Sequence, residues 1–257
     1  MPALAPVRFA TTLPRQHGAW SVLLLAYVLG LAVGGPNPPA LLLLPPLIAA
    51  LPLRHTALLW LRAGSSGRRR PLAVWLAVYG LVLILSGALL VGVYGRWLLL
   101  PPGALAGAVG LASAGLEQRR LDRTLGAELL GMVGLSLVVP ATVYAASGEF
   151  GAATFGLWLL AALDFSGSVF QVRFIARGGK GVVSVIFHLL ALGGAGAMGV
   201  LGFAPPLAAL SLVPAALRAV WAAAVPGGRQ PTIRRLGFEE LGYAAVFVLL
   251  AALAYRL

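Results

Sequence analysis

Residues 54–94 read RHTALLWLRAGSSGRRRPLAVWLAVYGLVLILSGALLVGVY. The stretch joins an arginine-rich loop, which ends at Arg70, to an apolar run over residues 71–94 that contains no charged side chain. An α-helix needs about 20 apolar residues to cross the hydrocarbon of a bilayer, and this run is long enough. The stretch therefore predicts a membrane-spanning helix that follows a basic loop.

The same unit recurs along the whole chain. Long apolar runs that could each form a spanning helix lie at residues 18–35, 38–61, 71–94, 97–116, 124–147, 150–176, 181–202, 205–225 and 236–256. The runs are continuous rather than alternating, which favours helices over a closed barrel. We therefore predict an all-α fold, in which residues 1–257 form one transmembrane domain, a polytopic bundle of about nine helices. Prolines at positions 45, 46 and 52 predict that the second helix is kinked or broken.

Positive charges cluster at alternate ends of the apolar runs, which lie on one side of the membrane if each run spans it. Of 19 lysines and arginines, only Arg96 and Arg256 lie at the opposite ends of the runs, and the others precede the first run or lie near the junctions after the second, fourth, sixth and eighth. Cytoplasmic loops carry such an excess of Lys and Arg. The pattern predicts a cytoplasmic N-terminus and, with nine spans, a C-terminus outside.

Composition agrees with a membrane protein. The chain is 60% hydrophobic and 10% charged, with a net charge of +12. Because the basic residues punctuate apolar runs, we exclude nucleic acid as a partner and predict anionic lipid headgroups at the cytoplasmic face. The absence of cysteine excludes disulfide and iron–sulfur chemistry. Glycine-rich strings in the fourth and seventh runs predict close helix contacts there.

The sixth run carries a polar stripe. Asp164, Ser168 and Gln171 are spaced i, i+4 and i+7, so they share one helix face, and Arg173 and Arg177 follow on another face. An ionisable group within a span is costly and points to a function. One interpretation is a stripe that faces an internal cavity open to the cytoplasm. The alternative is that Asp164 pairs with an arginine of a neighbouring helix and holds the bundle together.

Other acids lie near the starts of predicted helices. Glu128 follows Thr124 by one turn, and Glu239 and Glu240 open the ninth run. Each is a candidate for chemistry, but the helix dipole alone favours a carboxylate at a helix N-terminus. Of the last two acids, we expect Glu240 to face inward together with Tyr243.

Histidine and arginine supply the remaining candidates. His17 precedes the first span, and His188 lies in the seventh with Ser184 one turn earlier. Each histidine is a candidate proton-transfer group or an ordinary structural residue, and His17 is also a candidate ligand of a headgroup. Arg218, within the eighth run, either reaches the membrane edge or presents a fork to a phosphate or carboxylate. The histidines lack metal-ligand spacing, so no metal site is predicted.

Several short strings resemble the YwiC-like family of bacterial membrane proteins. They are His17-Gly18-Ala19-Trp20, Ser168-Val169-Phe170-x-Val172-Arg173, Phe187-His188, Pro214-x-x-x-Arg218 and Gly237-x-x-Glu240. The strings follow the family order and cover most of the chain. The resemblance implies a multi-pass protein of the bacterial inner membrane, and some relatives of this kind accompany nitrate-respiration genes.

The predicted architecture also resembles the UbiA prenyltransferase superfamily, with nine helices and polar extensions after the second and sixth spans. In that superfamily, N-D-x-x-D-x-x-x-D and D-x-x-x-D motifs at these extensions hold magnesium against a prenyl diphosphate. Here residues 54–70 contain no acid, and the second extension offers only Asp164. A metal–diphosphate clamp needs several oxygen ligands, so the sequence argues against magnesium-dependent prenyl transfer.

Together these features predict a UbiA-like cavity that binds an isoprenoid or quinone-like lipid, or its anionic headgroup, without a metal or another cofactor. The residues predicted to bind the headgroup are Arg54, Arg62, Gln171, Arg173, Arg177, Arg218 and Glu240. The candidate catalytic residues are Asp164, His188, His17 and Glu128. Two alternatives stay open: a non-catalytic membrane subunit or assembly factor of a respiratory complex, and a small-anion transporter.

Overall fold

The structure, a computed structural model, describes residues 9–14, 17–64, 66–178, 180–225 and 232–257. Within these ranges, every regular element is a helix. Among the described residues, eight helices are long and apolar enough to cross a membrane, and a shorter apolar helix covers Gly18–Gly34. The prediction of an all-α, polytopic membrane fold is confirmed.

Each predicted run appears as one helix or as two consecutive helices. The elements are α1 (Phe9–Thr12), α2 (His17–Gly34), α3 (Pro38–Leu42), α4 (Leu44–Arg62), α5 (Ser66–Gly92), η1 (Trp97–Leu99), α6 (Leu100–Gln118), α7 (Leu125–Ser136), α8 (Val138–Ser147), α9 (Ala152–Arg177), α10 (Gly181–Val200), η2 (Pro206–Leu212), α11 (Val213–Ala224) and α12 (Ile233–Ala254). Here η denotes a 3-10 helix.

The predicted break in the second span is confirmed. Helix α3 ends at Leu42 and α4 begins at Leu44, so the two meet at Leu43. Pro45 and Pro46 lack a backbone N–H, and their rings clash with the carbonyl groups one turn earlier. At this junction the Leu43 N–H bonds the Ala40 carbonyl, one residue nearer than the acceptor in an α-helix. A second break separates α7 from α8 at Leu137, shortly before Pro140.

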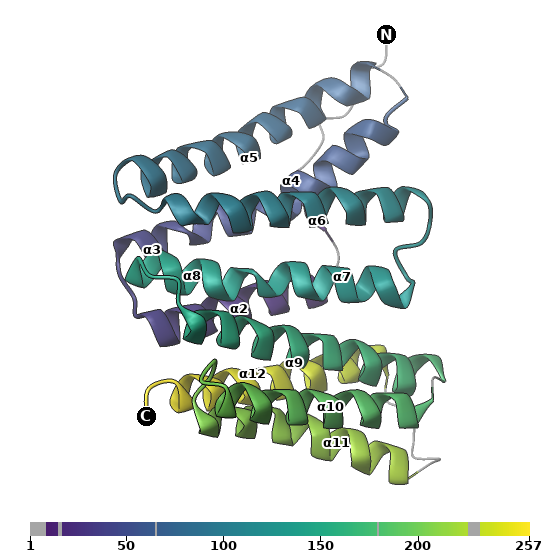
Figure 1. Cartoon of the computed structure of the whole chain (residues 1–257). Helices are drawn as coiled ribbons and strands as arrows, with labels where there is room; N and C mark the ends of the chain where they lie inside the picture. The colour runs from purple at the N-terminus through teal and green to yellow at the C-terminus, as the bar shows by residue number, and fades with distance from the viewer. Residues whose placement is uncertain (1–8, 15–16, 65, 179, 226–231) are drawn as a thin grey trace.

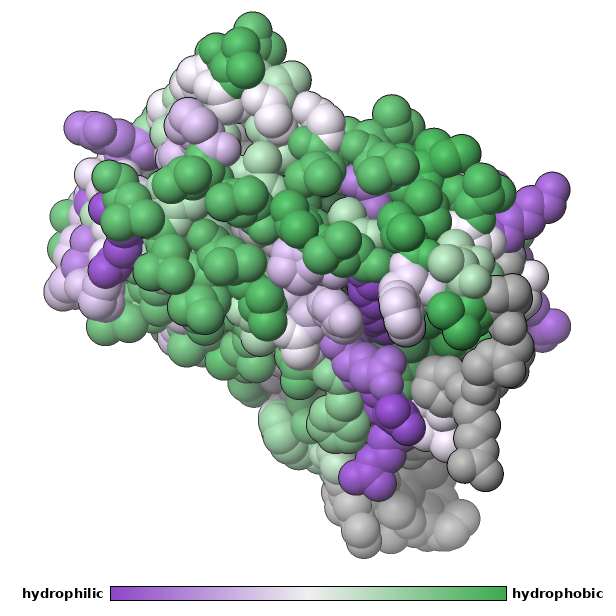
Figure 2. Space-filling model, turned by 90° about the horizontal axis from the view of Figure 1, so that it is seen from below, coloured by the Kyte–Doolittle hydropathy of each residue, from purple (hydrophilic) through white to green (hydrophobic). Residues whose placement is uncertain are grey.

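The long helices lie side by side in a row that runs from α5 at one edge to α11 at the other (Figure 1). We call the end at which α4, α6 and α9 finish, and at which α7, α10 and α12 begin, the basic end. A core of buried side chains from α2, α8, α9, α10 and α12 includes Leu29, Leu157, Leu160, Phe165 and Phe247. Figure 2, from the α11 side, shows a mainly hydrophobic face with hydrophilic residues at both ends and in one strip across the middle.

Helices α2 and α8 cross at close range. A Cβ added at Gly30 would lie 2.5 Å from the Thr142 Cβ, and one at Gly34 would lie 2.9 Å from the Ala146 Cβ. The two glycines are four residues apart and therefore share a face. Small residues at this spacing let backbones approach within a bilayer. The two glycines therefore let α2 pack closely against α8.

The prediction that glycines of the fourth and seventh runs make close contacts is largely wrong. A Cβ added at Gly103, Gly107 or Gly110 of α6 would meet no heavy atom within 4 Å, and the same holds at positions 193, 194 and 196 of α10. Of these strings, Gly199 does approach another segment, at Pro206. Glycine content alone does not reveal which face a neighbour covers, and α6 has no buried residue.

The two arginines at the other end of the bundle bind helix C-termini. Arg96 Nε donates to the Ala145 carbonyl at 3.0 Å, in the last turn of α8. Arg256 Nε donates to the Ala32 carbonyl at 2.6 Å, near the end of α2. The last carbonyls of a helix lack intrahelical partners and attract positive charge. A structural role therefore accounts for the two positive charges that depart from the pattern.

We expect Gly30→Ala to lower the free energy of unfolding by about 1–3 kcal/mol, because the added methyl overpacks the crossing of α2 and α8. The matched control is Gly107→Ala, where the methyl meets open space and the higher helix propensity of alanine raises stability by up to about 1 kcal/mol. Thermal unfolding in detergent measures both. Equal destabilisation by the two variants would contradict the crossing.

Candidate functional site

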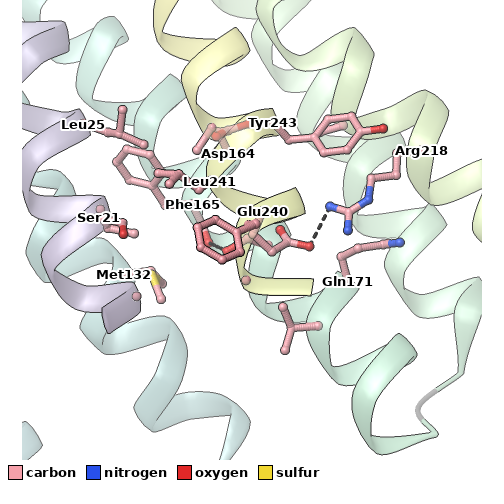
Figure 3. Close-up of a pocket in the computed structure, with 18 of the residues that line it drawn as sticks. Ser21, Leu25, Met132, Asp164, Phe165, Gln171, Arg218, Glu240, Leu241 and Tyr243 are labelled. Carbon is pink, nitrogen blue, oxygen red and sulfur yellow. Dashed lines mark hydrogen bonds and ion pairs between the residues drawn. The ribbon is translucent and has the colours of Figure 1, made fainter. Parts of the chain in front are cut away.

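A cavity of about 860 Å³ lies in the half of the bundle next to the basic end. Its walls come from α2, α7, α9, α10, α11 and α12, and half of the lining side chains are apolar. The polar and charged lining residues are Ser21, Asp164, Ser168, Gln171, His188, Arg218, Arg234, Glu240 and Tyr243. Figure 3 shows Arg218 and Gln171 at one side of the cavity and Ser21, Leu25 and Met132 at the other. The space is large enough for a lipid headgroup and part of its tail.

The polar stripe of α9 lines this cavity. Asp164, Ser168 and Gln171 all belong to its wall. Ser168 Oγ donates to the Phe165 carbonyl of its own helix at 2.8 Å. Within the described residues, Asp164 has neither a hydrogen bond nor an ion pair, and the nearby charge that acts on it is the like charge of Glu240. The alternative, in which an arginine of a neighbouring helix pairs with Asp164, does not describe this structure.

The side-chain amide of Gln171 forms a hydrogen bond through its oxygen, but its nitrogen has no hydrogen-bond partner among the described residues. Its side chain is almost fully buried, with 2% of its surface exposed. Ser184 Oγ on α10 donates to Gln171 Oε1 at 2.8 Å. The Nε2 group is buried and has no hydrogen-bond partner among the described residues. A buried donor without a partner is costly, and in a native protein it calls for an explanation.

His188 is fixed by the same turn of α10. Its Nδ1 lies 2.7 Å from the Ser184 carbonyl oxygen. A carbonyl oxygen can only accept, so Nδ1 carries the proton of this bond. The other nitrogen, Nε2, lies against Gly167 of α9, where an added Cβ would come within 2.8 Å of it. The imidazole therefore turns its second nitrogen toward α9, on the cavity side of α10.

Arg218 of α11 is the more deeply buried of the two arginines that line the cavity. Its Nη1 donates to Glu240 Oε1 of α12 at 2.6 Å, and its Cζ lies 4.5 Å from the centre of the Tyr243 ring. Its Nη2 is 3.6 Å from Glu239 Oε2, too far for a hydrogen bond. The described chain offers this buried Nη2 no hydrogen-bond partner. Figure 3 shows the guanidinium between Glu240 and Gln171.

The other arginines predicted to bind a headgroup lie elsewhere. Arg54 and Arg62 of α4 pair with Glu117 of α6, at 3.1 and 3.5 Å. Arg54 also donates to the Gly110 carbonyl and to Ser113 Oγ. Neither arginine lines the cavity. Both pair with one acid, Glu117, that the sequence argument did not consider.

A second ion-pair cluster, also outside the cavity, contains two more of the predicted arginines and one predicted acid. Arg173 and Arg177 bind Glu128 at 2.7 and 2.8 Å, and both also donate to the Arg123 carbonyl. This cluster ties α9 to α7 at the basic end. Glu128 is therefore a bridging carboxylate rather than a cavity residue. His17 begins α2, but its side chain lies outside the described residues, so its predicted role stays a prediction.

The structure thus divides the predicted residues into two sets. The cavity brings together Asp164, Gln171, His188, Arg218 and Glu240. The ion-pair clusters outside it hold Arg54, Arg62, Arg173, Arg177 and Glu128. Helix periodicity placed the α9 stripe on one face, but no local pattern reveals which acid on another helix neutralises each arginine. Gly167 was missed because its role is to leave room for His188.

Comparison with known proteins identifies the family. Residues 13–143, about half of the chain, match the family described as YwiC-like protein. The chain belongs to the YwiC-like family. The YwiC-like match includes α2 and α7, which form one side of the cavity, and it contains the first of the five strings, whereas the other four lie beyond residue 143.

No curated protein and no solved structure matches the chain. The UbiA-like architecture is therefore not confirmed. The same holds for the orientation across the membrane, since it depends on the charge pattern alone.

Replacing each of two cavity carboxylates by its amide should have different effects on the free energy of unfolding. Asp164→Asn is expected to leave the free energy of unfolding unchanged or to raise it by up to about 2.5 kcal/mol, because it removes an acid without a counter-charge from the centre of a span. Glu240→Gln breaks the buried pair with Arg218 and should cost about 3 kcal/mol. Thermal unfolding in detergent compares them. A clear loss of stability in Asp164→Asn would indicate that Asp164 has a structural partner.

Proposed function

We propose that this YwiC-like protein binds an isoprenoid or quinone-type lipid in the cavity. A headgroup oxygen accepts hydrogen bonds from Gln171 and Arg218, and the apolar tail passes toward α2 and α7. The observation that carries the proposal is the pair of buried N–H donors, Gln171 Nε2 and Arg218 Nη2, that lack hydrogen-bond partners within the described chain and belong to residues that line the cavity. Two such donors fit a ligand oxygen.

The shape and composition of the cavity support a lipid with a flat headgroup. Phe165, Phe238 and Tyr243 contribute aromatic rings to the wall. Leu25 and Met132 extend an apolar surface away from Arg218 (Figure 3). Small-molecule sites combine such apolar walls with a few placed polar groups. A headgroup near Gln171 would meet the polar groups, and a tail along Leu25 and Met132 would meet the apolar wall.

Charge favours a neutral headgroup over a phosphate or diphosphate. The charged lining residues are two arginines, Arg218 and Arg234, and two acids, Asp164 and Glu240, so basic residues do not outnumber acidic ones there. The four other arginines that could have met an anion are bound to Glu117 and Glu128. Strong phosphate sites present an excess of positive charge. The same balance argues against a small-anion pathway through this cavity.

Asp164 and His188 are the groups suited to proton transfer at the bound headgroup. Both line the cavity, and neither is used in an ion pair among the described residues. A carboxyl and an imidazole placed beside one ligand are the usual means of moving a proton. Arg218, which is held by Glu240, orients the headgroup rather than exchanging a proton.

Binding of a short-chain quinone to the purified protein tests the proposal. We expect decylubiquinone or a menaquinone analogue to bind the wild type, and Gln171→Leu to weaken its binding about tenfold because one buried hydrogen bond is lost. Arg62→Met is the matched control: it alters an arginine outside the cavity and should leave the Kd unchanged. Equal affinity in the wild type and Gln171→Leu would contradict the proposed site.

A membrane subunit or assembly factor is the second candidate. The open glycine face of α6 favours it, because small residues that no helix of the described chain covers are suited to packing against another membrane helix. Purification in mild detergent distinguishes the two functions. A stoichiometric partner polypeptide, on a protein that retains no lipid, would favour the subunit over the lipid site.

A further inference from the structure

Ser184 orients two cavity residues at once. Its hydroxyl donates to Gln171 Oε1, and its backbone carbonyl accepts from His188 Nδ1. The first bond leaves Gln171 Nε2 as a free donor. The second leaves His188 Nε2 as the nitrogen without a bond from this turn. Ser184 is itself 1% exposed, so the bonds are sheltered from competing water.

The free nitrogen of His188 has the opposite polarity to that of Gln171. Because Nδ1 carries the proton, the Nε2 atom of the neutral ring carries a lone pair and accepts a hydrogen bond. Gly167 lies one helical turn before Gln171, and it is the absence of a side chain there that lets Nε2 approach α9. A donor and an acceptor therefore lie about one helical turn apart along α9, on two residues that line the cavity.

We infer, on the basis of the proposed lipid site, that the cavity selects a hydroxyl-bearing headgroup, such as a hydroquinone or phenol, over the matching quinone. A hydroxyl oxygen accepts from Gln171 Nε2, and its hydrogen is donated to His188 Nε2. A quinone carbonyl can only accept, so it leaves the histidine lone pair unsatisfied and facing another lone pair. His188 is the residue that determines this specificity.

Sites that hydrogen-bond a ligand hydroxyl discriminate strongly against analogues that lack it, because their own buried groups are then left without partners. Here the discriminating acceptor belongs to His188, which is 7% exposed and whose Nδ1 lies 2.7 Å from the Ser184 carbonyl oxygen. The ring cannot turn away from the ligand without breaking that hydrogen bond. We expect the reduced form to bind about 10–100-fold more tightly than the oxidised form.

The experiment compares both redox forms of one probe on the purified full-length protein. Decylubiquinol, kept reduced under anaerobic conditions, and decylubiquinone are titrated separately into the wild type and into His188→Phe. The expected result is tighter binding of the quinol by the wild type and the loss of that preference in His188→Phe, whereas Arg62→Met, which alters an arginine outside the cavity, keeps the preference. Gly167→Ala, which pushes the ring away, should reduce the preference.

Each result has a distinct meaning. Equal binding of the two forms by the wild type overturns the selection but leaves the lipid site standing, and it requires no variant to fold. Binding of neither form overturns the lipid site itself. A preference that survives in folded His188→Phe shows that another residue makes the selection. Thermal unfolding establishes that each variant is folded.

Discussion

An ionised side chain within a membrane-spanning helix needs a counter-charge, and this constraint organises the bundle. Arg54 and Arg62 meet Glu117 between α4 and α6, and Arg173 and Arg177 meet Glu128 between α9 and α7. The third cluster ties α11 to α12 through Arg218 and Glu240. Each cluster joins different helices near the basic end, so the pairing of charge also fixes which helices stand together there.

Asp164 departs from this rule, and the departure defines the site. It lies midway along α9 and faces a cavity rather than an arginine. Besides Thr56 Oγ1 of α4, the buried side-chain atoms of the described residues that lack a hydrogen-bond partner are Gln171 Nε2 and Arg218 Nη2, and both belong to residues of this cavity. The other arginines predicted to bind a headgroup are all paired with acids, so a partner from the chain for these two donors would also be expected. Their concentration in one place is the signature of a site that a ligand completes.

The fold was largely predictable because its signals are local. Apolar run length located the spans, Pro45 and Pro46 located the break at Leu43, and helix periodicity placed Asp164, Ser168 and Gln171 on one face. The site was predictable only in part, because ion pairs and glycine contacts depend on which helices become neighbours. Glu117 and Gly167 carry no local signal for their roles. The glycines of α6 look like contact residues in sequence, yet the described chain leaves them open.

The central claim is that the cavity holds a neutral lipid whose headgroup meets Gln171 and Arg218. Native mass spectrometry combined with lipid extraction, on protein purified in mild detergent, tests it most directly. The account predicts a retained isoprenoid or quinone-type lipid without a phosphate group, in stoichiometric amount. A protein that carries no such lipid, or one that retains a prenyl diphosphate instead, would contradict it.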